Sequence, residues 1–129
     1  MSAGSHPTGM VNPLALETLE SHHISTEGLR SKSWDEFSAA DVQSIDFVFT
    51  VCDNAAGEVC PVWPGHPITA HWGVPDPAAV TGSVEERRIA FTQAFTTLKR
   101  RIDLFCALPM GSLSRMSLQE HVNRIGREA

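Results

Sequence analysis

Residues 45–51 read IDFVFTV, and residues 52–61 continue as CDNAAGEVCP. The first part consists largely of β-branched and aromatic residues and is apolar almost throughout. This pattern predicts a β-strand covered on both faces, as in a parallel sheet. Cys52 therefore follows the carboxyl end of a buried strand. Reactive groups of open α/β sheets lie at such strand ends, so we expect the functional site here.

Capping residues predict helices on both sides of this strand. Asn12 followed by Pro13 predicts a helix from Pro13 to about residue 21. Ser33 and Glu36 form a capping-box pattern, which predicts a short second helix. The same pattern recurs at Ser83 and Glu86, before a long helix expected over residues 84–108.

The long helix is expected to be amphipathic. Its predicted apolar face contains Phe91, Ala94, Phe95, Leu98, Ile102 and Phe105. Cys106 lies beside this face, where a thiol behaves as a small hydrophobic group, so we predict that Cys106 is buried in the core. A last helix through Leu118, Val122 and Ile125 is expected to end at Gly126.

The order of these elements predicts the fold class. Residues 53–67 form a long loop rich in proline and glycine, and residues 69–74 form a short extended segment. Helix, strand, loop, strand and helix in this order predict an α/β fold with a mainly parallel sheet. A chain of 129 residues with 42% hydrophobic content is long enough for one core, so we expect a single domain over residues 1–129.

Composition excludes several classes of partner. The formal net charge of -5 gives no basic surface, so neither nucleic acid nor an anionic membrane is expected as a partner. No apolar run approaches the roughly 18 residues of a membrane span, and the first residues have no leader pattern. We therefore expect a cytoplasmic protein. Three cysteines are too few for a secreted disulfide scaffold, so any disulfide should be transient and functional.

Cys52 and Cys60 are candidates for a redox-active pair. A bond between them would require Cα atoms within about 4.4 to 6.8 Å, and Asn54 and Gly57 allow the loop to bend. A loop that opens and closes between two thiols suits thiol–disulfide exchange. Two unrelated buried cysteines are one alternative. Zinc bound with His66 and His71 is another, although the cysteine spacing is wider than structural zinc sites use.

Asp76 is a candidate for proton transfer. It stands in the sequence Val74-Pro75-Asp76-Pro77, directly after the second extended segment. A carboxylate at the same sheet edge as the thiols could give a proton to a leaving oxygen or take one from an attacking group. The alternative is that Asp76 only forms a turn, as Asp-Pro sequences often do.

Several of these motifs, in this order, resemble one known family. The motifs are residues 2–7 (SAGSHP), residues 11–13 (VNP), the cysteine segment 51–61, residues 71–73 (HWG) and Asp76-Pro77. Together they resemble the arsenate reductases built on the low-molecular-weight tyrosine-phosphatase fold, of which the thioredoxin-coupled type is best known. The resemblance extends from residue 2 to about residue 126 and implies a three-layer fold, with a mainly parallel sheet flanked by helices.

The resemblance also implies roles for the candidate residues. In that family a nucleophilic cysteine in an amino-terminal phosphate loop attacks arsenate. Cys52 matches the cysteine that attacks the resulting adduct and releases arsenite, and Cys60 matches the cysteine that resolves the disulfide. Asp76 matches the family's acid. The implied reductant is thioredoxin, or glutathione with glutaredoxin, and no bound cofactor or metal is implied.

The chain departs from the family in one large feature. A Cys-x5-Arg loop requires Arg six positions after Cys, but Glu58, His66 and Ser112 occupy those positions here. The family's first strand, which is central in its sheet, and the helix that follows the loop are also unmatched. We therefore expect this chain to be inactive alone. A misplaced start codon, a truncated gene or a second polypeptide that supplies the strand would each account for the departure.

Two further functions stay open at this point. A protein-tyrosine phosphatase of the same fold would use the loop cysteine and Asp76 but would not need the cysteine pair. A non-catalytic remnant that only exchanges thiols or binds a partner is the other alternative. The presence of both Cys52 and Cys60 favours the reductase.

Overall fold

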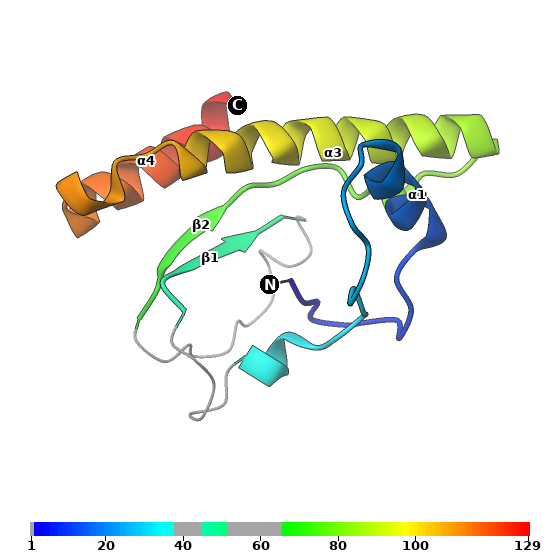
Figure 1. Cartoon of the computed structure of the whole chain (residues 1–129), viewed down its shortest axis with the longest axis horizontal. Coiled ribbons are helices and arrows are strands. Elements are labelled where there is room, and N and C mark those ends of the chain that lie inside the picture. Colours follow the sequence, from blue (N-terminus) through cyan, green and yellow to red (C-terminus); the bar gives the residue numbers. More distant parts are fainter. Residues whose placement is uncertain (1, 38–44, 52–65) are drawn as a thin grey trace.

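A computed structural model describes residues 2–37, 45–51 and 66–129 (Figure 1). In chain order its elements are helix α1 (Pro13–Ser21), the 3-10 helix η1 (Trp34–Phe37), strands β1 (Phe47–Thr50) and β2 (Ile68–His71), the 3-10 helix η2 (Pro77–Ala79), helix α3 (Val84–Cys106), the 3-10 helix η3 (Met110–Ser112) and helix α4 (Arg115–Glu128). None of the described helices is both long enough and apolar enough to cross a membrane.

Strands β1 and β2 form a parallel two-stranded sheet. Phe47 pairs with Ile68 at one end of the register and Thr50 with His71 at the other. The predicted α/β class and the parallel pairing are thus confirmed. The predicted strand over residues 45–51 is shorter in the structure, because regular pairing stops at Thr50. A separate parallel bridge joins Gly4 to Ser33.

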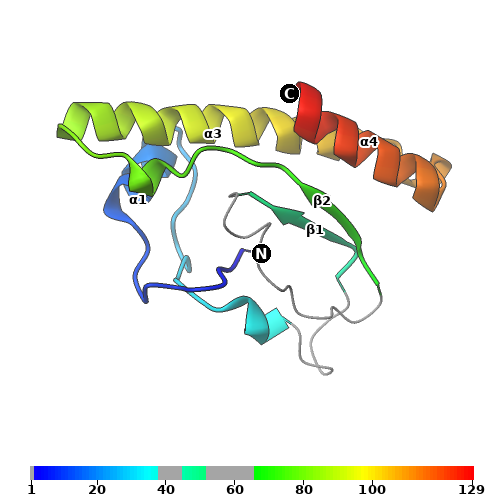
Figure 2. The ribbon, with the colours of Figure 1, turned by 180° about the vertical axis from the view of Figure 1, so that it is seen from behind.

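The core lies between β2 and α4, which are side by side in both ribbon views (Figures 1 and 2). Burial alternates along β2: Ile68 and Ala70 are buried, and the residues that follow them are exposed. These side chains and Trp72 pack against Val122 and Ile125 of α4, and Val122 is completely buried. The alternation arises because successive side chains of a strand point to opposite faces.

Aromatic rings extend this core onto β1 and α3. The ring of Phe49 stacks on Trp72 with centroids 3.9 Å apart. Phe105 of α3 meets Phe47 and Phe49 edge-on, with centroids 4.9 and 5.1 Å away. Offset and edge-on arrangements are those that aromatic pairs prefer. The same sheet face is therefore covered by both α3 and α4.

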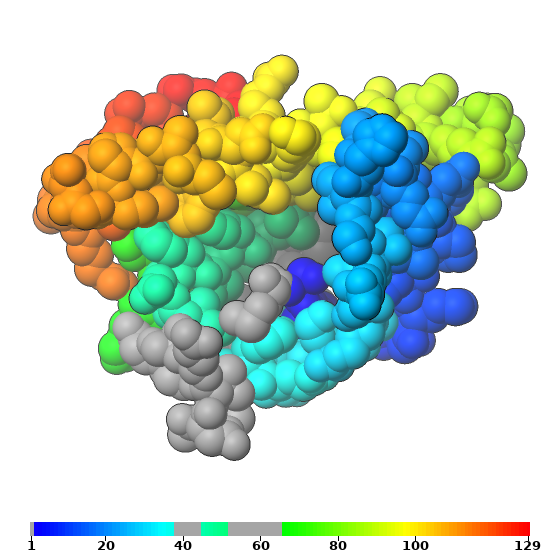
Figure 3. Space-filling model, in the orientation of Figure 1, coloured from blue at the N-terminus to red at the C-terminus, as the bar shows by residue number. Residues whose placement is uncertain are grey.

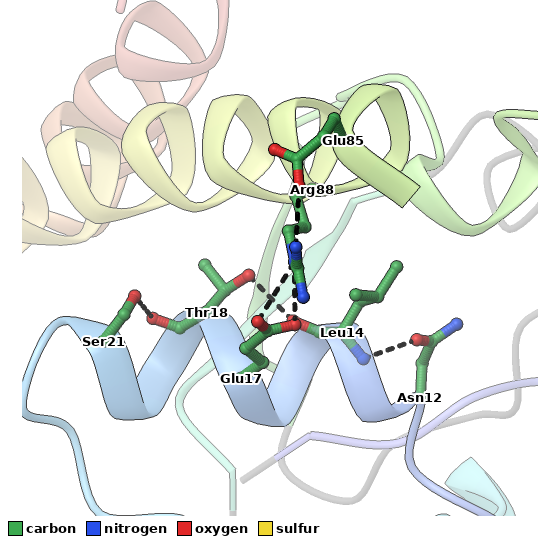
Figure 4. Close-up of polar contacts among 7 residues, drawn as sticks. All are labelled: Asn12, Leu14, Glu17, Thr18, Ser21, Glu85 and Arg88. Atoms are coloured by element: carbon green, nitrogen blue, oxygen red, sulfur yellow. Dashed lines mark hydrogen bonds and ion pairs between the residues drawn. The ribbon is translucent and has the colours of Figure 1, made fainter. Parts of the chain in front are cut away.

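Helix α1 packs against α3, away from the sheet (Figure 3). The predicted cap is confirmed, since Asn12 Oδ1 accepts a hydrogen bond from Leu14 N at 2.9 Å. Arg88 of α3 reaches Glu17 of α1 and also Glu85 on its own helix (Figure 4). Hydrogen bonding to Glu17, and then to Glu85, raises the pKa of Arg88. These contacts are solvent-exposed and contribute little to stability.

The capping box before η1 is only half formed. Ser33 Oγ accepts from Asp35 N at 3.2 Å, as a cap should. The Glu36 carboxylate does not turn back to the cap but accepts two hydrogen bonds from Arg30, at 2.7 and 3.1 Å. Hydrogen bonding to Arg30 lowers the pKa of Glu36. The Glu36 side chain thus ties η1 to the preceding segment.

Two predictions about the apolar face of α3 were wrong. Ile102 was expected on that face but is 50% exposed. Cys106 was expected in the core but is an exposed free thiol. The buried positions are Phe91 and Arg101, followed four residues later by the half-buried Phe105. The buried stripe therefore passes through Arg101 rather than Ile102, and Cys106, four residues beyond Ile102, is turned toward solvent with it.

Helix α4 corrects a third prediction, because it continues through Gly126 to Glu128. Gly126 does not terminate the helix but allows it to approach β2 closely. A Cβ atom at this position would lie 2.7 Å from Trp72 Cδ1 and 2.9 Å from the carbonyl oxygen of His71. A side chain at this position would therefore overlap with atoms of β2 and Trp72.

We expect Gly126→Ala to destabilise the protein by about 1 to 3 kcal/mol, because the new methyl group overpacks the α4–β2 interface. In an ordinary helix the same change would stabilise by about 1 kcal/mol. Urea unfolding followed by far-UV circular dichroism measures the difference. Gly111→Ala is the matched control, because a Cβ there meets no atom within 4 Å. Equal or greater stability of Gly126→Ala would contradict this account of the close approach.

Candidate functional site

The carboxyl ends of β1 and β2 meet at one edge of the sheet. Trp72 N donates to the Thr50 carbonyl oxygen at 2.7 Å, and Val74 N donates to the Val51 carbonyl oxygen at 2.8 Å. The two chains thus stay in contact beyond the regular strands. Val51 is the residue before Cys52, and Val74 stands two residues before Asp76. The sequence predicted the functional site at this edge.

The structure describes only one of the three predicted site residues. Cys52 and Cys60 lie outside the described residues, and so does most of the loop predicted over residues 53–67. Val51 is the described residue that directly precedes Cys52 in the sequence.

Asp76 is exposed and begins η2. Its Oδ1 atom accepts a hydrogen bond from Ala78 N at 2.9 Å, which caps this short helix. Asp76 thus forms the turn that its sequence favours, and it also holds a solvent-accessible carboxylate just beyond the end of β2. This geometry is compatible with proton transfer, since an aspartate in a cap retains further lone pairs on both oxygens.

Arg101 was not predicted as part of the site. Its side chain comes from α3, is 7% exposed, and donates to the carbonyl oxygens of Trp72 at 2.8 Å and Gly73 at 3.2 Å. It also donates to the backbone oxygen of Ala129 at 3.3 Å. A signal was present in the sequence: Leu98, Arg101 and Phe105 follow the helical spacing of three and four, so Arg101 occupies a position of the apolar stripe.

His66 and His71, which the zinc hypothesis named as ligands, make other contacts in the structure. His71 Nδ1 and Thr50 Oγ1 are hydrogen-bonded at 2.7 Å, which joins the last residues of the two strands. His66 has a positive φ of 50°, and its carbonyl oxygen accepts from Arg115 at 2.6 Å. Among residues 2–37, 45–51 and 66–129 no group of three or more His, Cys, Asp or Glu side chains could hold a metal ion. The two cysteines of that alternative lie outside these ranges.

A separate open cavity of about 490 Å³ lies on another face of α3. It is lined by His22, Phe95, Thr96, Lys99, Arg100, Asp103 and Leu104. The ring of His22 stacks on Phe95 at a centroid distance of 4.1 Å. None of the residues at the carboxyl edge of the sheet lines this cavity, so it is distinct from the candidate site.

Comparison with known proteins finds relatives of this chain among the arsenate reductases. The chain is 33% identical over 104 residues to an arsenate reductase of Halalkalibacterium halodurans, and 32% identical to one of Oceanobacillus iheyensis. It is 30% identical to an arsenate reductase of Bacillus subtilis. Each match covers 81% of this chain and 71% of the relative.

The profile of one protein family, described as low molecular weight phosphotyrosine protein phosphatase, matches residues 1–121. The match spans both strands, the Asp76 turn, α3 and the first half of α4. The resemblance inferred from the sequence motifs is confirmed. The chain belongs to the low molecular weight phosphotyrosine protein phosphatase family.

Proposed function

We propose that this chain carries the resolving part of an arsenate reductase. The observation that supports it most is the shared edge of the sheet. Val51, which precedes Cys52, is hydrogen-bonded to Val74, which leads into the Asp76 turn. A thiol and a carboxylate are thereby attached to two backbone segments that are held together. The arsenate reductases among the relatives make arsenate the proposed substrate.

The proposed reaction passes two electrons from thiols to arsenic. A nucleophilic cysteine in a Cys-x5-Arg loop first displaces an oxygen of arsenate and forms a sulfur–arsenic bond. The Cys52 thiolate then attacks the sulfur of that cysteine. A disulfide forms, the sulfur–arsenic bond breaks, and the electron pair leaves with arsenic, which departs as arsenite.

Cys60 completes the relay in this proposal. Its thiolate attacks Cys52, forms the Cys52–Cys60 disulfide and returns the nucleophilic cysteine as a thiol. The dithiol of thioredoxin, or two glutathione thiols acting with glutaredoxin, then reduces the pair and is itself oxidised to a disulfide. Thiol–disulfide exchange of this kind needs an accessible thiolate and a displaced thiol that leaves readily.

Asp76 is proposed to protonate the oxygen that leaves arsenic in the first step. Its exposure and its position beyond the end of β2 support this role. A general acid in this position contributes roughly a hundred- to ten-thousandfold to a rate. The cap to Ala78 N holds the carboxylate on a defined turn.

A phosphatase is the second candidate, favoured by the description of the family. It would use the same loop cysteine and Asp76, with phosphate ester in place of arsenate. The two activities separate at the cysteine pair, because ester hydrolysis needs neither Cys52 nor Cys60. Equal loss of both activities on Cys52→Ser would argue against the relay.

We expect mild oxidation of this chain to link Cys52 to Cys60 and to leave Cys106 as a free thiol. The first two cysteines are only eight positions apart in the sequence, next to or within the loop predicted over residues 53–67, whereas Cys106 is at the end of α3. Non-reducing peptide mapping by mass spectrometry identifies the bridge. Cys106→Ser should leave the result unchanged, and Cys60→Ser should abolish it. A dominant bridge to Cys106 would refute the assignment of the relay.

A further inference from the structure

We propose that Arg101 is a positioning residue that holds the end of β2, and with it the Asp76 turn, in the geometry needed for proton transfer. This inference rests on the proposed function, in which Asp76 transfers the proton. Arg101 itself is on α3 and bonds to backbone oxygens, so it acts through the segment that it holds.

The first step of the argument is the burial of a charge. Arg101 is 7% exposed, and a buried guanidinium is costly unless its N–H groups find acceptors. Its acceptors here are backbone oxygens, at 2.8 Å for Trp72, 3.2 Å for Gly73 and 3.3 Å for Ala129. Hydrogen bonds from a charged donor are stronger than neutral ones. Arg101 therefore defines where these backbone groups lie.

The second step is the position of these carbonyl groups. Trp72 and Gly73 are the residues at which β2 leaves its regular pairing. On the same stretch, the N–H groups of Trp72 and Val74 donate to Thr50 and Val51 of the neighbouring chain. The end of β2 is thus held twice, through its N–H groups by the β1 segment and through its carbonyl groups by Arg101.

The third step is the short distance along the chain to the carboxylate. Only Val74 and Pro75 separate Gly73 from Asp76, and Pro77 follows. Each proline fixes its own φ angle, so this connection has few ways to bend. A displacement at Gly73 is therefore transmitted to Asp76. A misplacement of about 1 Å in a reacting group can lower a rate by about a hundredfold.

The planar fork of arginine suits this task better than lysine. A guanidinium presents several N–H donors in fixed directions and can bond to neighbouring carbonyl groups at once, whereas an ammonium is a compact point charge. Arg101→Lys should thus retain part of the function, and Arg101→Met should retain least. Arg100→Met is the matched control, because Arg100 is the preceding residue of α3 and is exposed.

The test on the chain itself is amide hydrogen exchange measured by NMR. In Arg101→Met we expect the Val74 amide to exchange about ten- to a hundredfold faster relative to the Val122 amide of the core, because charge-assisted bonds beside it are lost. Arg101→Lys should lie between, and Arg100→Met should match the parent. A uniform loss of protection at Val74 and Val122 alike, in both Arg101 variants, would overturn the inference in favour of a merely structural role.

The functional test uses the chain joined to a family-type strand and Cys-x5-Arg loop. We expect Arg101→Met to lower kcat by about ten- to a hundredfold with little change in the KM for arsenate, since the turn and not the anion site is displaced. In an Asp76→Asn background, Arg101→Met should cause little further loss. If the loss of kcat in the double variant equalled the product of the losses in the two single variants, the inference would be overturned. No turnover in the joined parent would refute the proposed function, and hydrogen exchange would then decide the positioning role alone.

Discussion

The 129-residue chain should release no measurable arsenite from arsenate, even with thioredoxin or glutaredoxin present, and joining it to a strand with a Cys-x5-Arg loop should produce turnover. The reason is the order of steps. In the proposed relay Cys52 attacks a sulfur–arsenic adduct, and the sequence contains no Cys-x5-Arg loop to form that adduct. Resolving thiols alone have no disulfide to resolve.

The expected effect is large because the loop supplies both the nucleophile and the anion site. Backbone N–H groups and an arginine would stabilise charge that develops on the oxyanion, and loss of even one such donor typically costs about a hundred- to a thousandfold in kcat. Loss of the nucleophile removes the covalent route as well. Turnover by the chain alone should therefore not exceed the background reaction of the reductant.

The prediction is checked by measuring arsenite release from arsenate. Four proteins are compared: the chain alone, the joined protein, and the joined protein with Cys52→Ser or with Cys106→Ser. Cys106→Ser is the control, because Cys106 is an exposed thiol outside the proposed relay. Substantial turnover by the chain alone would show that the nucleophile has been assigned to the wrong place. Full activity of the Cys52→Ser protein would show that the relay does not use Cys52.

The sequence predicted the parts of the fold that depend on local pattern. Within the run at residues 45–51, Phe47–Thr50 form a parallel strand, because β-branched and aromatic side chains favour extended backbone. The expected burial of this strand on both faces was wrong, since all four of its residues are half-buried. Asn12 and Ser83 became caps because their side-chain oxygens accept from backbone N–H groups of the first helical turn. Such features depend on neighbours in the chain, which a sequence displays directly.

The errors concern residues whose place is decided by tertiary contacts. Glycine is typical of a helix end, but Gly126 lies inside α4, where the helix approaches Trp72 closely. Ile102 and Cys106 are apolar enough for the core, yet Arg101 takes the inward position because carbonyl groups at the end of β2 accept its hydrogen bonds. Hydrophobicity alone could not rank an arginine above an isoleucine at this position.

For the candidate site, sequence reasoning located the edge but not what supports it. Asp76 follows β2 as expected, and Val51 and Val74 join the two strand ends. The roles of Cys52, Cys60 and Asp76 stay predictions. The role of Arg101 was not predicted, because its partners are backbone oxygens. Every residue has such an oxygen, so no sequence motif identifies these partners.

Trp72→Ala should lower the free energy of unfolding by about 3 to 5 kcal/mol, as expected for removing a buried aromatic side chain from a core. Trp72 is 2% exposed, stacks on Phe49 and donates from Nε1 to the Val122 carbonyl oxygen at 2.9 Å. It thus joins β1, β2 and α4 at the point where the candidate site begins. A loss of this size is a large fraction of the roughly 5 to 15 kcal/mol that stabilises a typical domain.

Trp72→Phe separates packing from hydrogen bonding. It keeps an aromatic ring but removes the indole N–H, so we expect a loss between those of the parent and Trp72→Ala, with about 1 kcal/mol due to the hydrogen bond. Urea unfolding followed by far-UV circular dichroism avoids interference from the other tryptophans. Trp34→Ala is the control, because Trp34 lies in η1 outside the buried cluster and should cost less. Similar losses for Trp34→Ala and Trp72→Ala would show that the cluster between β2 and α4 is not the main core.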